Sequence, residues 1–132
     1  MKSLLKKVIC CIDCRATDLA QARAGLRCAR CGRIYRRVGE CPVFHDDPSV
    51  SVRQADHHRD PPAEIRRFLR NTHRPILNLD SGYLPETEGN VINADFQVYI
   101  NTDAAVDVHA LPFIDNAFSA VVSANLLENI VD

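Results

Sequence analysis

Apolar positions in the second half of the chain fall in short runs separated by turn residues. These runs predict strands at 76–79, 90–95 and 117–123. The uninterrupted apolar run at 120–122 is typical of a strand that is buried on both faces, as in a parallel sheet. Further apolar positions between 126 and 130 indicate that a helix follows this strand. The second half therefore predicts an α/β layer with a mainly parallel sheet.

The first half has shorter apolar runs that are interrupted by arginines. Short strands are predicted at Leu26–Cys28 and Arg33–Val38, and Gly32 is suited to the turn between them. Residues 44–60 show no convincing apolar period, so they are interpreted as a linker. The histidines of this linker are expected to face solvent: His45, His57 and His58.

A helix is predicted at about 61–71. Asp60 can cap its first turn, and prolines at 61 and 62 are tolerated there because the first turn leaves backbone N–H groups unbonded. Apolar positions recur at the helical spacing i, i+3, i+4 and i+7, which predicts a stripe that packs on the core. The stripe consists of Ile65, Phe68, Leu69 and Thr72.

Four cysteines in two matched Cys-x-x-Cys pairs are the sharpest chemical signal in the chain. The pairs are separated by 13 residues, which is enough for the chain to return antiparallel to itself, and each pair can direct two sulfurs at one ion. The pattern predicts a zinc ribbon, with zinc favoured over iron because no neighbouring residues indicate a redox site. The predicted ligands are Cys11, Cys14, Cys28 and Cys31.

Other interpretations of the cysteines stay open at this point. A single Cys-x-x-Cys pair can be a redox motif, and a small buried cysteine can serve packing alone. Cys10 competes with Cys11 for the metal, but only Cys11 has the two-residue spacing to Cys14. Cys10 is therefore predicted to be a core thiol. Cys41 lies ten positions past the second pair with no partner at ligand spacing, and it is also assigned to packing.

Charge is distributed unevenly along the chain. All 16 Lys and Arg residues lie between Lys2 and Arg74, whereas the 17 Asp and Glu residues divide into 8 before residue 75 and 9 after it. The two segments carry net charges of +8 and −9. A basic half can follow the phosphate backbone of RNA, or it can dock on an acidic surface of this chain, of a second copy or of another protein.

Length and composition suit two modules better than one. The 132 residues, 46% hydrophobic, allow a zinc ribbon at 1–45, a linker and helix at 46–73, and a partial α/β domain at 74–132. No stretch approaches the roughly 18 apolar residues that a membrane span requires. Because metal-binding thiolates must stay reduced, a cytoplasmic protein with no membrane partner is expected.

Several segments of the second half occur in an order typical of one enzyme family. Ile76–Gly82 is similar to a first strand with its glycine-rich turn, Asp95 ends the second strand, and Asp107 precedes the run Leu111–Val122. Together, residues 74–131 resemble the first half of the class I S-adenosylmethionine-dependent methyltransferases. The resemblance implies a truncated Rossmann-like sheet that binds S-adenosylmethionine.

The resemblance also implies roles for individual residues. Gly82 lets the backbone approach the methionine part of the cofactor, Asp95 accepts from the ribose hydroxyls, and Asp107 contacts the adenine amino group. The remaining candidates for cofactor binding lie in the first strand and its turn: Asn78, Asp80 and Ser81. No residue is assigned as catalytic.

The cysteine-rich segment carries a second resemblance. Beyond the two cysteine pairs, it contains Ile34-Tyr35 and the run Gly39–Phe44. With these features, residues 8–44 resemble the zinc-ribbon family that includes the small activator subunit of RNA and protein methyltransferases. Cys41 stands where that family usually has an aliphatic residue, which agrees with its assignment to packing.

The second half departs from the methyltransferase pattern at several positions. Asp80 and Leu84 replace the first and last glycines of the turn, Ser119 replaces an aspartate, and Asn129 replaces a histidine. The family continues with three further strands beyond the fourth, so an abbreviated sheet with an exposed edge is expected, which favours dimerisation or a protein partner. The sequence thus predicts a methyltransferase-family protein with a structural zinc ribbon. The alternative is a non-catalytic zinc-ribbon module that binds or activates a protein or RNA partner.

Overall fold

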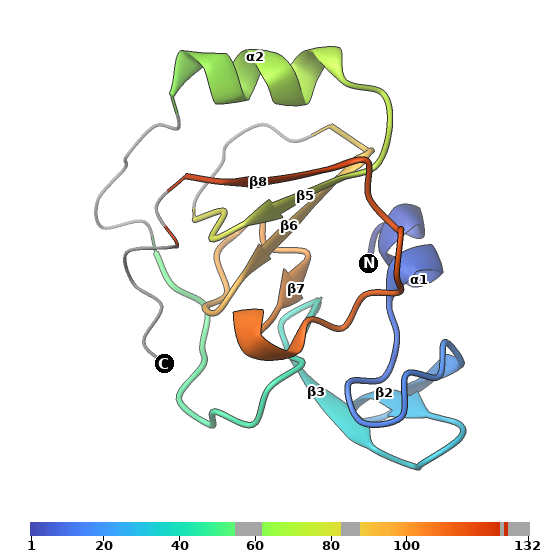
Figure 1. Cartoon of the computed structure of the whole chain (residues 1–132). Coiled ribbons are helices and arrows are strands. Elements are labelled where there is room, and N and C mark those ends of the chain that lie inside the picture. Colours follow the sequence, from blue (N-terminus) through green and yellow to red (C-terminus); the bar gives the residue numbers. More distant parts are fainter. Residues whose placement is uncertain (55–61, 83–87, 125, 127–132) are drawn as a thin grey trace.

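The computed structural model describes residues 1–54, 62–82, 88–124 and 126, which form two four-stranded sheets, two α-helices and a 3-10 helix (Figure 1). The fold is mixed α/β, with one antiparallel and one parallel sheet. The elements in chain order are α1 (Ser3–Val8), β1 (Leu19–Ala22), β2 (Gly25–Cys28), β3 (Ile34–Val38), β4 (Cys41–Pro42), α2 (Ala63–Asn71), β5 (Ile76–Leu79), β6 (Val91–Asp95), β7 (Ala104–Ala105), the 3-10 helix η1 (Val108–Ala110) and β8 (Ala120–Ser123).

The antiparallel sheet has the order β1-β2-β3-β4, and the two strands predicted around the second cysteine pair are confirmed as β2 and β3. Gly25 begins β2 with φ +143°, and a Cβ at this position would lie 1.9 Å from the carbonyl oxygen of Tyr35. Because no side chain fits in that space, only glycine permits the close pairing of β2 with β3.

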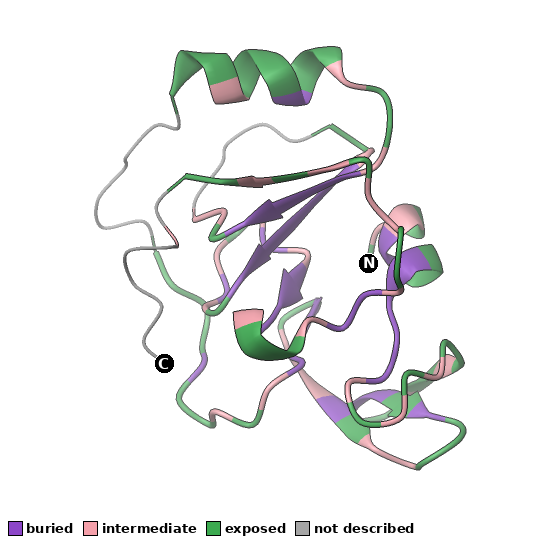
Figure 2. Ribbon diagram, in the orientation of Figure 1, coloured by how far each residue is buried: buried purple, intermediate pink, exposed green. Residues whose placement is uncertain are grey.

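The parallel sheet has the order β7-β6-β5-β8. Ile76 of β5 pairs with Val91 of β6 on one side and with Ala120 of β8 on the other. The strands predicted at 76–79 and 90–95 are confirmed, and β5, β6 and β7 are buried along their whole length (Figure 2). This sheet forms the centre of the second half of the chain.

The expectation that residues 120–122 are buried on both faces is wrong. β8 alternates between partly buried and exposed positions, and Val121 is 59% exposed. The reason is its place in the sheet, because β8 pairs with β5 on one side and with no other strand of the described residues. Leu126 packs against the main core, and the rest of the helix expected at this point lies outside the described residues.

The helix predicted at about 61–71 is confirmed as α2, which lies across one side of the parallel sheet (Figure 1). Its N-cap is Pro62, and no side chain makes a capping hydrogen bond there; Asp60 lies outside the described residues. Leu69 is buried against Ile76 of β5 and Val91 of β6. Phe68 is 43% exposed, so its expected place in the core stripe is wrong.

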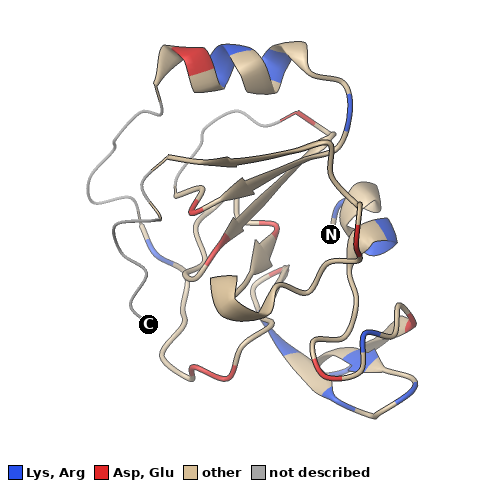
Figure 3. Cartoon of the chain, in the orientation of Figure 1, with Lys and Arg blue, Asp and Glu red and all other residues tan. Residues whose placement is uncertain are grey.

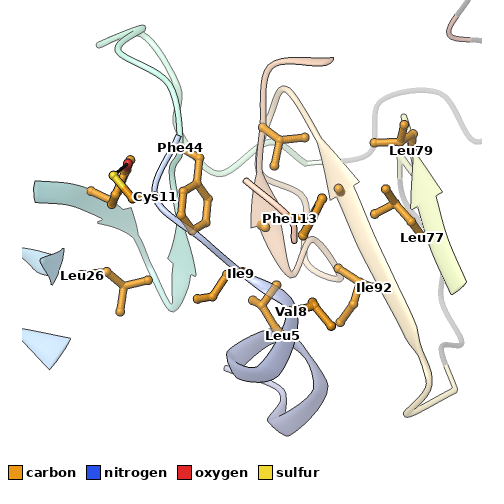
Figure 4. Packing of buried hydrophobic residues seen from close by; sticks show 14 of the residues in the cluster. Leu5, Val8, Ile9, Cys11, Leu26, Phe44, Leu77, Leu79, Ile92 and Phe113 are labelled. Atoms are coloured by element: carbon orange, nitrogen blue, oxygen red, sulfur yellow. Dashed lines mark hydrogen bonds between the residues drawn. The ribbon is translucent and has the colours of Figure 1, made fainter. Parts of the chain in front are cut away.

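α1 joins the two sheets. Leu5, Val8 and Ile9 are buried in one cluster with residues of the parallel sheet and of the segment 8–44, which holds the cysteine turns and the antiparallel sheet and is called the ribbon below (Figure 4). The segment after α1 runs antiparallel to residues 112–114, with hydrogen bonds from Cys10 N to the oxygen of Pro112 and from Ile114 N to the oxygen of Val8, both 2.8 Å. The two predicted modules therefore share a core.

Part of the predicted linker packs on the parallel sheet. Val50 is buried beside Val98, and Arg53 N donates to the oxygen of Val98 at 2.7 Å. His45 is half-buried and stacks on Phe96, with ring centroids 4.2 Å apart, so its expected exposure to solvent is wrong. The other two histidines lie outside the described residues. Within the described ranges, no helix is long and apolar enough to cross a membrane.

Candidate metal centre and cofactor pocket

The two cysteine pairs adopt the same backbone turn. In the first turn, Arg15 N donates to the oxygen of Cys11 and Cys11 N donates to the oxygen of Ala16, at 2.9 and 2.8 Å. The second turn repeats these bonds seventeen positions later, from Gly32 N to the oxygen of Cys28 and from Cys28 N to the oxygen of Arg33, at 3.0 and 2.8 Å. Both pairs thus present their sulfurs from equivalent positions.

The equivalence extends to an unusual backbone conformation. Gly32, four residues after Cys28, has φ +79°, and Arg15, four residues after Cys11, has φ +59°. A side chain disfavours this left-handed region, so the first turn carries strain that glycine avoids in the second. The Arg15 guanidinium donates to the backbone oxygens of Leu111 and Phe113, which holds the first turn against the parallel-sheet half.

The four predicted ligands converge. Their Sγ atoms all lie within 4.8 Å of one another, with Cys11 and Cys31 3.5 Å apart and Cys14 and Cys28 3.6 Å apart. A tetrahedral zinc site with bonds of about 2.3 Å places its sulfurs about 3.8 Å apart. The cluster therefore matches the size of such a site, and the four cysteines can hold a metal ion such as zinc.

Tyr35 supports the cluster from β3. Its hydroxyl lies 3.0 Å from the sulfur of Cys11, within hydrogen-bond distance, and accepts from Ile12 N at 3.0 Å. Burial opposes ionisation of Cys11, but the hydrogen bonds from Tyr35 and from the backbone of residues 13 and 14 outweigh it and lower the pKa of Cys11 to about 6. The cysteine spacing contained no sign of this residue.

An ion-pair bridge connects the two turns. The Arg33 guanidinium binds both carboxylate oxygens of Asp13 at 2.8 and 2.9 Å, and it also binds Asp46 at 2.9 Å. Asp13 lies inside the first cysteine pair, whereas Arg33 follows the second. This contact fixes the turns relative to one another from outside the sulfur cluster.

The remaining cysteines behave as predicted. Cys10 is 1% exposed and Cys41 is 6% exposed, and neither belongs to the sulfur cluster. Burial raises the pKa of both thiols, to about 12 for Cys41. Both side chains are packing residues.

A pocket of about 310 Å³ lies at the carboxyl ends of the parallel strands. Three of the six predicted cofactor-binding residues line this pocket. Asp80 follows β5, Asp95 ends β6 and Asp107 follows β7. The other lining residues are Leu79, Ala94, Phe96, Val106, Val108, His109 and Leu126.

Asp95 is the most buried of the three acids, at 6% exposed. Its carboxylate accepts from Gly82 N and Gln97 N, both at 2.9 Å. Burial raises its pKa above the ordinary value, although these two hydrogen bonds act in the opposite direction. Asp95 therefore ties the end of β6 to the turn after β5.

The turn after β5 contains two residues with positive φ. Asp80 has φ +53° and Gly82 has φ +54°, so both occupy the left-handed region. A Cβ at Gly82 would meet nothing within 4 Å, and the buried Oγ of Ser81 has no hydrogen-bond partner among the described residues. Asn78 lies elsewhere, inside the sheet, where it donates to the Asn93 side chain at 3.0 Å.

Asp107 is paired with a histidine that the sequence interpretation overlooked. One carboxylate oxygen accepts from His109 N at 2.9 Å and lies 2.8 Å from His109 Nδ1. These hydrogen bonds lower the pKa of Asp107. Phe96, also overlooked, is 41% exposed and lines the pocket, and its ring stacks on His45. Phe96 directly follows β6 and His109 lies within η1, and at neither position does the hydrophobic pattern contain a signal for a pocket.

Comparison of the chain with protein-family models, with curated proteins and with solved structures finds no match in any of the three.

Proposed function

We propose that residues 8–44 form a structural zinc ribbon related to the methyltransferase activator family. The convergence of four sulfurs from two equivalent turns supports this assignment. Zinc has no redox chemistry of its own in such a closed four-sulfur site, so its role is to hold the ribbon together.

Elemental analysis of purified protein tests this part of the proposal, with about one zinc per chain expected. Cys31→Ala removes an exposed ligand and is expected to lose the metal, whereas Cys41→Ala removes a buried thiol outside the cluster and is expected to keep it. Equal zinc content in the two variants would contradict the assignment.

We further propose that the parallel-sheet half binds S-adenosylmethionine as a member of the methyltransferase family. The strand order β7-β6-β5-β8 supports this, because it corresponds to the order 3-2-1-4 that begins a doubly wound sheet. In such sheets the ligand lies outside the carboxyl ends of the strands, near the point where the order reverses. β5 occupies that central position here.

The single observation that carries this proposal is the pocket at the strand ends, with Asp95 at its base. The open space in front of Gly82 and the unpartnered Oγ of Ser81 fit a polar ligand that approaches the turn backbone. Both oxygens of Asp95 accept one backbone N–H each, which leaves lone pairs for the hydroxyls of a ribose.

Calorimetric titration of the metal-loaded protein with S-adenosylmethionine tests the cofactor proposal. Saturable heat is expected, and Asp107→Asn, which alters the pocket lining, is expected to weaken binding by about tenfold. Asp115→Asn is the control, because it removes the same charge at a side chain that is 94% exposed and outside the pocket. If the folded, zinc-loaded wild-type protein gives no heat of binding at millimolar S-adenosylmethionine, the cofactor proposal is refuted.

A second candidate function is a non-catalytic binding module, and the exposed edge of β8 favours it. Val121 is 59% exposed there, and the outer backbone of β8 is unpaired within the described chain. A strand of another polypeptide can add to such an edge. If cofactor binding is absent while Val121→Lys converts a dimer or complex into a monomer in light scattering, this second function is the correct one.

A further inference from the structure

The arginines of the ribbon divide into two groups by what their side chains contact. Arg33 binds Asp13 and Asp46, and Arg36 donates to the backbone oxygens of Asp47 and Val50, so both stabilise the fold. Another group is exposed and has no hydrogen-bond or ion-pair partner among the described residues. This group consists of Arg23, Arg27 and Arg30.

The unpartnered arginines lie close together along the chain. Arg27 points outward from β2 beside Ile34 of β3, which is 55% exposed, while Leu26 and Tyr35 point inward. Arg23 lies in the turn before β2 and Arg30 in the turn after it, so the three follow one another over roughly 23 Å of chain at most. Basic residues concentrate on this part of the ribbon (Figure 3).

Arginines outnumber acids in this part of the ribbon, where Asp18 is the adjoining acid and its backbone oxygen accepts from Ala29 N at 2.9 Å. Residues 19–38 contain six arginines and neither Asp nor Glu. A four-thiolate zinc centre is itself anionic, but the arginines outnumber its charge. We propose that the surface formed by Arg23, Arg27 and Arg30 binds the phosphate backbone of a nucleic acid strand.

A polyanion fits this surface better than the acidic half of a second copy. Three of the acids described in that half already have partners, since Asp103 pairs with Lys2, Asp115 with Arg15 and Asp107 with His109. Nucleic acid, in contrast, presents a phosphate charge about every 1.7 Å of duplex axis. The planar guanidinium group of arginine can donate two parallel hydrogen bonds to phosphate oxygens, and the exposed Ile34 offers an apolar contact beside Arg27.

Fluorescence anisotropy of the metal-loaded protein with labelled oligonucleotides tests the proposal over a range of salt concentrations. Single-stranded and double-stranded oligonucleotides of RNA and of DNA, all of the same sequence, show which kind of nucleic acid the surface binds. Wild-type protein is expected to bind at least one of them with an affinity that falls steeply with salt. In Arg27→Gln/Arg30→Gln, the slope of log affinity against log salt is expected to decrease in magnitude by about 1.4 to 1.8.

The matched control is Arg67→Gln/Arg74→Gln, which removes the same charge from exposed arginines outside the ribbon and is expected to leave the slope unchanged. Zinc content and thermal unfolding verify that both double variants fold. Absence of binding at low salt, or equal loss in the two variants, would overturn the proposal. Equally effective competition by polyglutamate would assign the surface to an acidic protein instead, and would also overturn it.

Discussion

Tyr35 shows how a single residue outside a motif can determine the chemistry inside it. Its ring packs on Phe44, with centroids 4.8 Å apart, while its hydroxyl reaches the sulfur of Cys11. The ring therefore belongs to the core and the hydroxyl to the metal site. The two contributions can be separated by substitution.

Tyr35→Phe is expected to keep the fold and to weaken metal binding by about 10- to 100-fold, because it removes a hydrogen bond that favours the Cys11 thiolate. Competition with a chromogenic zinc chelator measures this change. Tyr99→Phe makes the same chemical change on the parallel-sheet side and is expected to have no effect on the metal. Unaltered zinc affinity in Tyr35→Phe would show that the hydroxyl does not support the thiolate.

Arg15 combines a strained backbone with a useful side chain. Arg15→Gly and Arg15→Ala both remove its hydrogen bonds to residues 111 and 113, but only glycine relieves the left-handed conformation. The glycine variant is therefore expected to be more stable than the alanine variant by about 1 kcal/mol. Urea denaturation of the two metal-loaded variants measures the difference, and equal stability would exclude backbone strain at this turn.

Asp95 is expected to make stability depend on pH. Burial raises its pKa in the folded protein, so its carboxylate is disfavoured there, and stability falls as pH rises from the pKa of the unfolded chain to that of the folded protein. Asp95→Asn lacks this effect. The free energy of unfolding of the wild type, relative to the variant, is therefore expected to decrease over this pH interval in urea denaturation. A relative increase would indicate that hydrogen bonds outweigh burial.

Among the elements, β8 shows how the same apolar sequence has different consequences at the edge and in the middle of a sheet. Val121 is exposed, whereas Val122 packs against the cluster of Leu69, Ile76 and Val91 under α2. Only one face of this strand is covered. The two valines should therefore differ in their contribution to stability.

Val122→Thr is expected to lower the free energy of unfolding by about 1 kcal/mol, because it places a hydroxyl against an apolar cluster. Val121→Thr makes the identical change on the exposed face and is expected to alter stability by less than about 0.5 kcal/mol. Thermal or urea denaturation provides the measurement. Equal loss of stability in the two variants would contradict the exposure of Val121 and would mean that another molecule covers this side chain in solution.

At the scale of the whole molecule, the ribbon and the parallel sheet contact each other through backbone pairing, side-chain hydrogen bonds and a shared core. Ile9 pairs with Phe113, Arg15 binds the backbone of the same segment, and Leu5 lies in the core that both halves share (Figure 4). The segment at 111–115 leads from the pocket to β8. The ribbon therefore contacts the segment that leads from the pocket to β8.

Removal of the metal is expected to increase hydrogen exchange at the amides of Cys10 and Ile114 as well as within the ribbon, because the pairing between these segments depends on the first cysteine turn. Hydrogen-exchange mass spectrometry before and after chelation measures this. Peptides from β5 and β6 are the internal reference. Exchange that rises only between residues 11 and 38 would mean that the two halves are independent.

Local sequence signals were sufficient for much of this structure. The spacing of the cysteines identified four side chains that converge, and apolar periodicity located β2, β3, α2, β5 and β6, because turns and amphipathic elements depend on residues that are near in sequence. The three pocket acids were found through the resemblance of the second half to methyltransferases, which implies cofactor contacts for Asp95 and Asp107 and places Asp80 in the first turn.

Features that depend on distant parts of the chain required the folded structure. The exposure of Val121 follows from which strand pairs with β8, the support of Cys11 comes from Tyr35 on another strand, and His45 stacks on Phe96 from a distant segment. The core shared through α1 likewise joins segments about a hundred positions apart. Periodicity records which face of an element is apolar, whereas the neighbour that covers that face is selected only when the whole chain packs.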